Sequence, residues 1–168
     1  MLSELENYLQ RIEDHHRQII EMIDDMPREG LNFFPIVVPQ MQVSNSIAIL
    51  AMHVAGAEHH WIGEVVGGLP VTRDRDTEFT VRVRNSSPLI EILNNTLAET
   101  KSIFAKLTEA DLSRIYEVDE KQVPGRWAIL HVIDHTALHL GQMQITHQIW
   151  AKGDSRSSPM WFSRLPPK

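Results

Sequence analysis

Cysteine is absent from this chain of 168 residues. Its absence excludes disulfide bonds, thiolate metal ligands and a cysteine nucleophile. Any bound metal ion must therefore be held by nitrogen and oxygen atoms. A chain of this length buries roughly 70% of the surface that its unfolded form exposes, so a stable core needs no covalent cross-links. We expect one domain over residues 1–168.

Long apolar runs and basic surfaces are also missing. No apolar run approaches the ~20 residues that span a bilayer, and the first residues (MLSELENYLQ) are too polar for a secretory signal. Lys and Arg number 16 against 22 Asp and Glu, for a formal net charge of -6. The basic residues are scattered, except for four arginines between residues 73 and 84. We therefore expect a cytoplasmic protein that binds neither membranes nor nucleic acids.

Apolar residues recur at steps of three and four in four segments, which is typical of amphipathic helices. The segments cover residues 2–26, 44–67, 87–107 and 124–152, and proline or glycine marks their ends. A polar connector, residues 69–86, separates the second helix from the third. Because no strand-rich region accompanies the helices, the sequence predicts an all-α protein, an antiparallel four-helix bundle.

Three local features refine this prediction. Phe79, Val81 and Val83 alternate with polar residues in the connector, so a short strand is possible there, although it would have no partner. The stretch from Thr108 to Asp111 resembles a capping box, which predicts an extra helical turn. The expected core residues include three tryptophans and the apolar stripe of the last helix: Trp61, Trp127, Trp150, Leu130, Leu138 and Ile145.

Nine histidines in one small domain suggest a metal site. His131, His135 and His139 follow one another at steps of four, and each step rotates by only ~40°, so they share one side of the last helix. His53 lies in the apolar stripe of the second helix and is the opposing candidate. Two histidines one turn apart and a third from another helix form a three-nitrogen set with open coordination positions. Open positions are typical of reactive metal ions.

Spacing alone leaves several ligand sets open. The pair on the last helix is either His131 with His135 or His135 with His139. His60, seven residues after His53, also remains a candidate. A single histidine on an apolar face is more commonly a hydrogen-bonded core residue than a ligand. We expect core or surface positions for five of the nine: His15, His16, His59, His60 and His147.

Other chemistries lack the residues that they need. A di-iron carboxylate bundle requires the pattern Glu-x-x-His twice, and only Glu13 and His16 match it. The sequence contains no glycine-rich phosphate loop and no serine nucleophile elbow. These absences leave the histidines as the strongest functional signal.

Two stretches of sequence resemble the DinB/YfiT-like family of metal-binding helical bundles. They are NSIAILAMHVAGAEHHW around His53 and HVIDHTALHLGQMQ at residues 131–144, where His-x-x-x-His precedes a Gly-Gln pair. The resemblance implies that His53, His135 and His139 are the ligands and that His131 lies outside the set. Gln142 either supports His139 or packs between helices. This chain has Leu140 where the family commonly has arginine.

The resemblance also implies a function. One divalent transition metal ion (Ni, Zn, Fe or Mn) would activate a low-molecular-weight thiol such as mycothiol or bacillithiol, or a water, in a metal-dependent transferase. We expect a small-molecule substrate and a homodimer, with Arg73 or Arg75 near the site to receive a carboxylate. Two alternatives remain: a non-catalytic metal-binding or stress-related protein, and a plain dimeric helical scaffold.

Overall fold

The computed structural model describes residues 1–38 and 44–153 and is mostly helical, as predicted. None of the described helices is both long and apolar enough to span a membrane. The elements, in chain order, are α1 (Ser3–Ile23), α2 (Arg28–Leu31), α3 (Ile47–Glu58), the π-helix η1 (His59–Val66), α4 (Arg75–Glu78), α5 (Ser87–Phe104), α6 (Glu109–Ser113), β1 (Ile115–Val118), β2 (Lys121–Pro124) and α7 (Gly125–Trp150).

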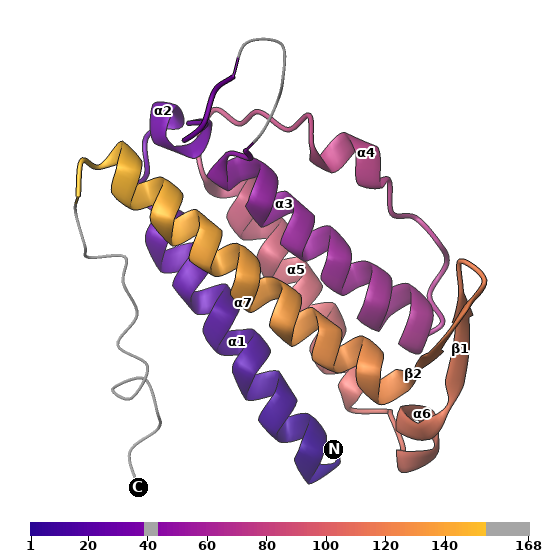
Figure 1. Ribbon diagram of the computed structural model, residues 1–168. Coiled ribbons are helices and arrows are strands. Elements are labelled where there is room, and N and C mark those ends of the chain that lie inside the picture. Colours follow the sequence, from indigo (N-terminus) through magenta and orange to yellow (C-terminus); the bar gives the residue numbers. More distant parts are fainter. Residues whose placement is uncertain (39–43, 154–168) are drawn as a thin grey trace, which may run out of the picture.

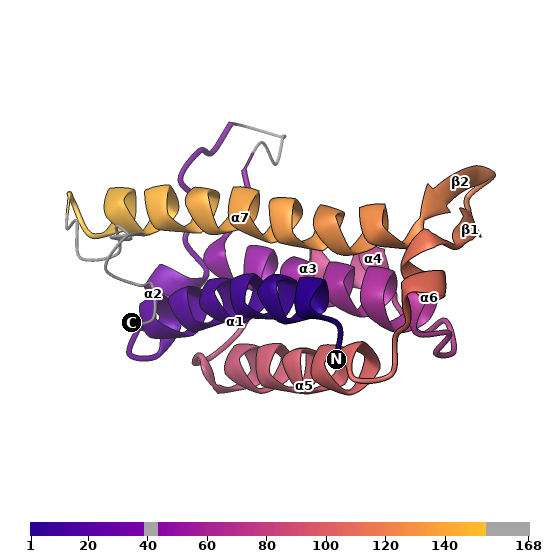
Figure 2. The ribbon, with the colours of Figure 1, turned by 90° about the horizontal axis from the view of Figure 1, so that it is seen from below.

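The four long helices do not all alternate in direction. Helix α1 packs on α5 and α7, and α3 packs on the same two helices. Figures 1 and 2 show α1 and α7 running one way and α3 and α5 the other. Accordingly, Arg126 at the start of α7 donates to Glu4 at the start of α1, over 2.7 Å. The predicted antiparallel arrangement is therefore wrong for the pairs α1–α7 and α3–α5. The cause is the connector 69–86, which is long enough to return along α3, so α5 starts again at the same end.

Local signals explain several helix boundaries. The Ser46 hydroxyl caps α3 by accepting the amide N–H of Ile49 over 3.3 Å. Pro88 occupies the first turn of α5, where its missing N–H costs nothing. Thr108 and Asp111 form a full capping box, and the extra turn predicted there is α6. The predicted second helix has the expected extent, but its last eight residues form a π-helix.

The predicted strand in the connector does not form, and a hairpin forms elsewhere. Phe79 follows the short helix α4, and Val81 lies in irregular chain. The two strands are β1 and β2, with Ile115 opposite Pro124 and Val118 opposite Lys121. Asp119 and Glu120, between them, both have positive φ angles, 46° and 63°. A two-residue hairpin turn needs this conformation, but it is usually signalled by glycine or asparagine, which this turn lacks.

The last helix buries a different face from the one predicted. Trp127, Leu138 and Ile145 are 48%, 62% and 60% exposed, and Leu130 is also exposed. The buried face carries Ala128, Ile129, Val132, Leu140 and Met143. Both faces of α7 are apolar, so periodicity could not choose between them. Leu140 therefore contributes to the core, and an apolar stripe of α7 remains exposed.

Candidate metal centre

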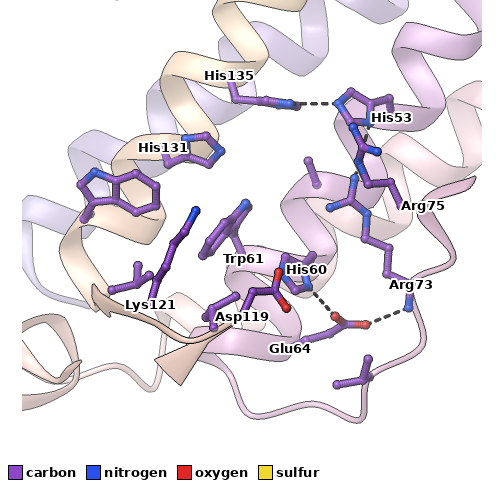
Figure 3. Close-up of a pocket in the computed structure, with 15 residues that line it drawn as sticks. His53, His60, Trp61, Glu64, Arg73, Arg75, Asp119, Lys121, His131 and His135 are labelled. Carbon is purple, nitrogen blue, oxygen red and sulfur yellow. Dashed lines mark hydrogen bonds and ion pairs between the residues drawn. The ribbon is translucent and has the colours of Figure 1, made fainter. Parts of the chain in front are cut away.

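Three histidines from two helices meet where α3 packs against α7. His53 lies in the middle of α3, and His135 and His139 lie one turn apart on α7. The Nε2 atom of His135 is 3.0 Å from Nε2 of His53 and 3.1 Å from Nε2 of His139. The three candidate ligand nitrogens all lie within 4.8 Å of one another. Figure 3 shows His53 and His135 facing each other. The structure therefore brings together the three residues that the resemblance implied.

The alternative ligand sets are not brought together in this way. His131 stacks on Trp127, with 4.9 Å between ring centroids and 6° between ring planes, and its centroid is 5.5 Å from that of His135. His60 is hydrogen-bonded through Nδ1 to Glu64 over 2.7 Å. In the part of the chain that the structure describes, the converging group contains neither His131 nor His60. It also excludes the other histidines for which we expected core or surface positions: His15, His16, His59 and His147.

Glu78, in the connector, binds the other ring nitrogen of His53. The Nδ1–H group of His53 donates to Oε2 of Glu78 over 2.8 Å. Arg73 donates to both carboxylate oxygens, from Nε over 2.6 Å and from Nη2 over 2.9 Å. Burial by itself raises the pKa of Glu78, but the hydrogen bonds from His53 and Arg73 outweigh it and hold the pKa below its ordinary value. An ionised Glu78 accepts the Nδ1 proton, which leaves the Nε2 atom of His53 facing the other histidines as the candidate ligand atom.

Gln142 supports His139 in the same manner. The Nδ1–H group of His139 donates to Oε1 of Gln142 over 2.7 Å. Burial lowers the pKa of His139, although the bond to Gln142 opposes this shift. The ring is then neutral with its proton on Nδ1, and its Nε2 lone pair also faces His135. Of the two roles considered for Gln142, the structure supports the contact with His139.

The available protons cannot satisfy these three nitrogens. Burial, followed by repulsion from His139 and His53, lowers the pKa of His135 to about 3. A neutral His135 can donate at most one hydrogen from Nε2, yet two lone pairs face this atom at hydrogen-bonding distance. Its Nδ1 atom has no hydrogen-bond partner among the described residues. A divalent cation between the rings would satisfy all three lone pairs, and imidazole nitrogen suits several such ions. The three histidines therefore fit a metal site with open positions.

A cavity of about 520 Å³ lies beside His53 and His135. Trp61, Trp127 and His131 form its aromatic side, because Trp61 lies edge-on to both other rings, at centroid distances of 5.6 and 5.3 Å. The predicted core position of Trp127 is therefore wrong, whereas the partly buried Trp61 contacts both the core and the cavity. The candidate metal centre thus opens onto a space large enough for a small molecule.

Three cationic side chains line this cavity: Arg73, Arg75 and Lys121 (Figure 3). The Arg73 guanidinium already pairs with Glu78 through Nε and Nη2, so its charge is compensated within the protein. Arg75 lies over the ring of Phe79, 4.9 Å from its centroid. Within the described ranges, neither Arg75 nor Lys121 forms an ion pair with an acidic side chain. Arg75 and Lys121 are therefore the cations available to an anionic group.

Glu78 and Lys121 were not singled out from the sequence. Glu78 lies 25 residues after His53, in a segment without clear periodicity. The sequence contains one local signal, because Asp is a preferred N-cap residue. In the structure Asp74 caps α4 by accepting the amide N–H of Thr77 over 3.4 Å. Lys121 depends on a hairpin that lacks the usual turn residues.

The fold and this group of histidines define a class of mostly helical proteins with a candidate three-histidine metal centre. A family model described as Mycothiol-S-transferase matches residues 5–150, and the chain belongs to this DinB-like family. The resemblance found in the sequence is therefore confirmed.

A solved structure supports the fold. A crystal structure described as the conserved protein of a locus from Enterococcus faecalis has a TM-score of 0.68 with this chain. The two are 19% identical, over 90% of this chain and 99% of that one. At this identity the likeness shows the fold alone. No curated protein matches the chain.

Proposed function

We propose that this protein is a metal-dependent S-transferase, which joins the sulfur of a low-molecular-weight thiol to a small electrophile. The observation that supports this proposal is the convergence of three Nε2 atoms beside a cavity, in a chain of the Mycothiol-S-transferase family. A divalent ion held there would lower the pKa of a bound thiol, so that the thiolate forms at neutral pH.

The residues of the chain have separate parts in this proposal. His53, His135 and His139 hold one divalent ion, and Glu78 and Gln142 orient two of these rings. Both substrates would bind in the cavity that His53 and His135 line, beside the ion. Nickel, zinc, iron and manganese all accept imidazole ligands, so the metal must be identified by analysis.

The cavity favours substrates with a negative charge and a flat or apolar part. Arg75 and Lys121 supply cations that lack acidic partners among the described residues. Trp61, Trp127 and His131 supply a ring surface of low polarity. We propose that a carboxylate of the electrophile or the thiol binds to the two cations.

Four broader features also remain predictions. The four long helices would form a four-helix bundle in a single domain, and the protein would be cytoplasmic. It would also form a homodimer, for which the exposed apolar stripe of α7 is the candidate surface: Leu130, Leu138, Ile145 and Ile149.

A conjugation assay tests the proposed function. Protein purified without a histidine tag is loaded with one metal ion at a time and mixed with mycothiol, bacillithiol, glutathione or coenzyme A and several electrophiles. We expect at least one combination to react faster than with the His139→Ala variant, because the variant lacks one proposed ligand. Metal binding without turnover would favour a binding protein instead, and the absence of bound metal would favour a plain helical scaffold.

A further inference from the structure

We infer that the connector 69–86 is a functional part of the metal centre: Glu78, held by Arg73, positions His53 to bind the metal, and Gly56 provides the space for this pair. This inference rests on the proposed metal site but not on the proposed transfer reaction. Glu78 is a positioning residue because it acts through His53, and Arg73 acts in turn through Glu78.

Hydrogen bonds hold the connector in place on both sides of Arg73. One oxygen of Glu64, in η1, accepts the amide N–H groups of Thr72 over 2.6 Å and of Arg73 over 2.9 Å. These bonds, with the bond from His60, outweigh burial and lower the pKa of Glu64 to about 2. On the other side, the cap of Asp74 starts α4, at whose end Glu78 lies. The connector is thus anchored to the π-helix and presents Glu78 to His53.

The absence of a side chain at Gly56 is required by this arrangement. Gly56 lies one turn after His53 on the same helix. A Cβ atom at this position would lie 2.8 Å from Cδ of Glu78 and even closer to Oε1. It would also lie 3.4 Å from Nε of Arg73. Because Arg73 donates to both carboxylate oxygens, Glu78 cannot shift by itself without losing these bonds. An alanine here must therefore displace Glu78 from His53.

Glu78 selects the tautomer of His53 that can bind a metal ion. A carboxylate only accepts, so Nδ1 carries the proton and Nε2 keeps its lone pair. Nη2 of Arg73 lies 3.5 Å from the same Nδ1 atom. If Glu78 is removed, this guanidinium remains as the nearest polar group, and it can only donate. It then favours the other tautomer, in which the proton occupies Nε2 and blocks metal binding. Removing Arg73 as well should therefore restore part of the affinity.

Cobalt titrations of the full-length protein test this inference, because Co²⁺ binding is visible by absorbance and needs no substrate. Glu78→Ala should weaken Co²⁺ binding by about 10–100-fold, the usual effect of removing such a support. Glu78→Gln, which keeps the shape, should weaken it less. The Arg73→Met/Glu78→Ala double variant should bind Co²⁺ more tightly than Glu78→Ala alone. A purely structural role of the ion pair would predict the opposite order.

Matched controls separate this effect from general damage. Asp76→Asn changes an exposed acid of the same short helix, and Gly141→Ala adds a methyl group on α7 where no atom lies within 4 Å. Both should bind Co²⁺ like the wild type, whereas Gly56→Ala should bind about 10-fold more weakly or worse. Circular dichroism melts verify folding. If Gly56→Ala fails to fold, the Co²⁺ affinities of Glu78→Ala and the isosteric Glu78→Gln still test the role of Glu78.

Three results would overturn the inference. The first is equal Co²⁺ affinity and an equal absorption spectrum for the wild type and Glu78→Ala. The second is an Arg73→Met/Glu78→Ala variant that binds Co²⁺ no more tightly than Glu78→Ala. The third is a wild-type protein that does not bind Co²⁺, which would remove the metal site as well. Failure of the conjugation assay, with the Co²⁺ differences intact, would contradict the transferase proposal alone.

Discussion

Two buried histidine–carboxylate pairs lie on different sides of the helix formed by α3 and η1, and they differ in which ring nitrogen the carboxylate takes. At the interface with α7, Glu78 binds Nδ1 of His53 over 2.8 Å and leaves Nε2 facing two more imidazoles. At the interface with α1 and α5, Glu58 binds Nε2 of His16 over 2.6 Å. Its other oxygen accepts from the hydroxyl of Thr100 over 2.6 Å. The same residue types thus form part of a candidate metal centre in one place and a buried pair within the core in the other.

The difference shows what distinguishes a site from a structural pair. Glu58 and His16 are almost completely buried, at 0% and 1% exposure, and neither lines the cavity described above. Both oxygens of Glu58 are satisfied by partners within the core, and although Nδ1 of His16 has no hydrogen-bond partner among the described residues, no group of histidines converges on it and it lines no cavity described above. At His53, by contrast, the carboxylate binds Nδ1, and the Nε2 atoms of three histidines converge beside a cavity. A histidine–carboxylate pair therefore indicates a metal site only when the second ring nitrogen faces further ligands beside a cavity.

The largest expected effect is the loss of metal. His53→Ala, His135→Ala and His139→Ala should each lose the single divalent ion, because two remaining imidazoles cannot enclose it. His16→Ala should keep the ion at about one per chain if it folds. Elemental analysis of proteins purified without a histidine tag measures this contrast. Stoichiometric metal in all three variants would refute the ligand assignment.

The second pair should matter for stability instead. Glu58→Ala leaves His16 and Thr100 buried without their acceptor, and we expect a loss of about 3 kcal/mol in the free energy of unfolding. Metal binding by the folded variant should remain unchanged. Urea denaturation of the metal-free protein and a Co²⁺ titration measure the two effects separately. If Glu58→Ala kept full stability but bound Co²⁺ more weakly, Glu58 would belong to the metal centre and not to a structural pair.

The metal-free protein should lose stability as pH falls from about 6.5 toward 3. Burial lowers the pKa of His15 to about 4 and that of His135 to about 3. Because both folded values lie below the unfolded one, the unfolded chain binds protons first. The stabilisation is complete above about pH 6.5 and is lost through this window, by a few kcal/mol.

Urea midpoints between pH 7 and pH 4 check this dependence. The His135→Leu variant should show a shallower fall, since it lacks one of the two histidines whose pKa is lowered furthest. A fall of equal size in the variant would assign the pH dependence to other groups. The carboxyl groups of Glu64 and Glu78, whose pKa values are lowered, destabilise the fold only when pH drops below their ordinary range, so the upper part of the window reports the histidines.

The sequence predicted the parts of this centre that depend on periodicity. His135 and His139 share a helix side because a step of four nearly completes a turn, and the apolar stripe around His53 located the opposing helix. The choice of His139 over His131 came from the resemblance. In the structure, His131 stacks on Trp127, while Gln142 accepts a hydrogen bond from His139.

Other parts depend on contacts that no spacing encodes. Glu78 reaches His53 only because the connector folds back along α3, and nothing local predicts such a return. The orientation of α7 could not be predicted because Leu138 and Leu140 give opposite faces similar hydrophobicity. The hairpin that carries Lys121 turns at Asp119 and Glu120, which adopt positive φ angles without the usual residues.

Among the three histidines of α7 around the centre, His131→Ala should have the smallest effect on metal binding, and it sharpens the contrast with His139→Ala. His131 and His139 are each one turn from His135, but only His139 directs a nitrogen at the other two rings. We expect His131→Ala to bind Co²⁺ within about twofold of the wild type, whereas a lost ligand weakens binding by orders of magnitude.

Because His131 lines the cavity and stacks on Trp127, its loss should instead weaken substrate binding, and the KM of any transfer reaction should rise more than kcat falls. Metal analysis and steady-state kinetics on the same preparation measure both. If His131→Ala empties the site and His139→Ala does not, the ligand pair on α7 is His131 and His135, and the centre lies one turn closer to Trp127.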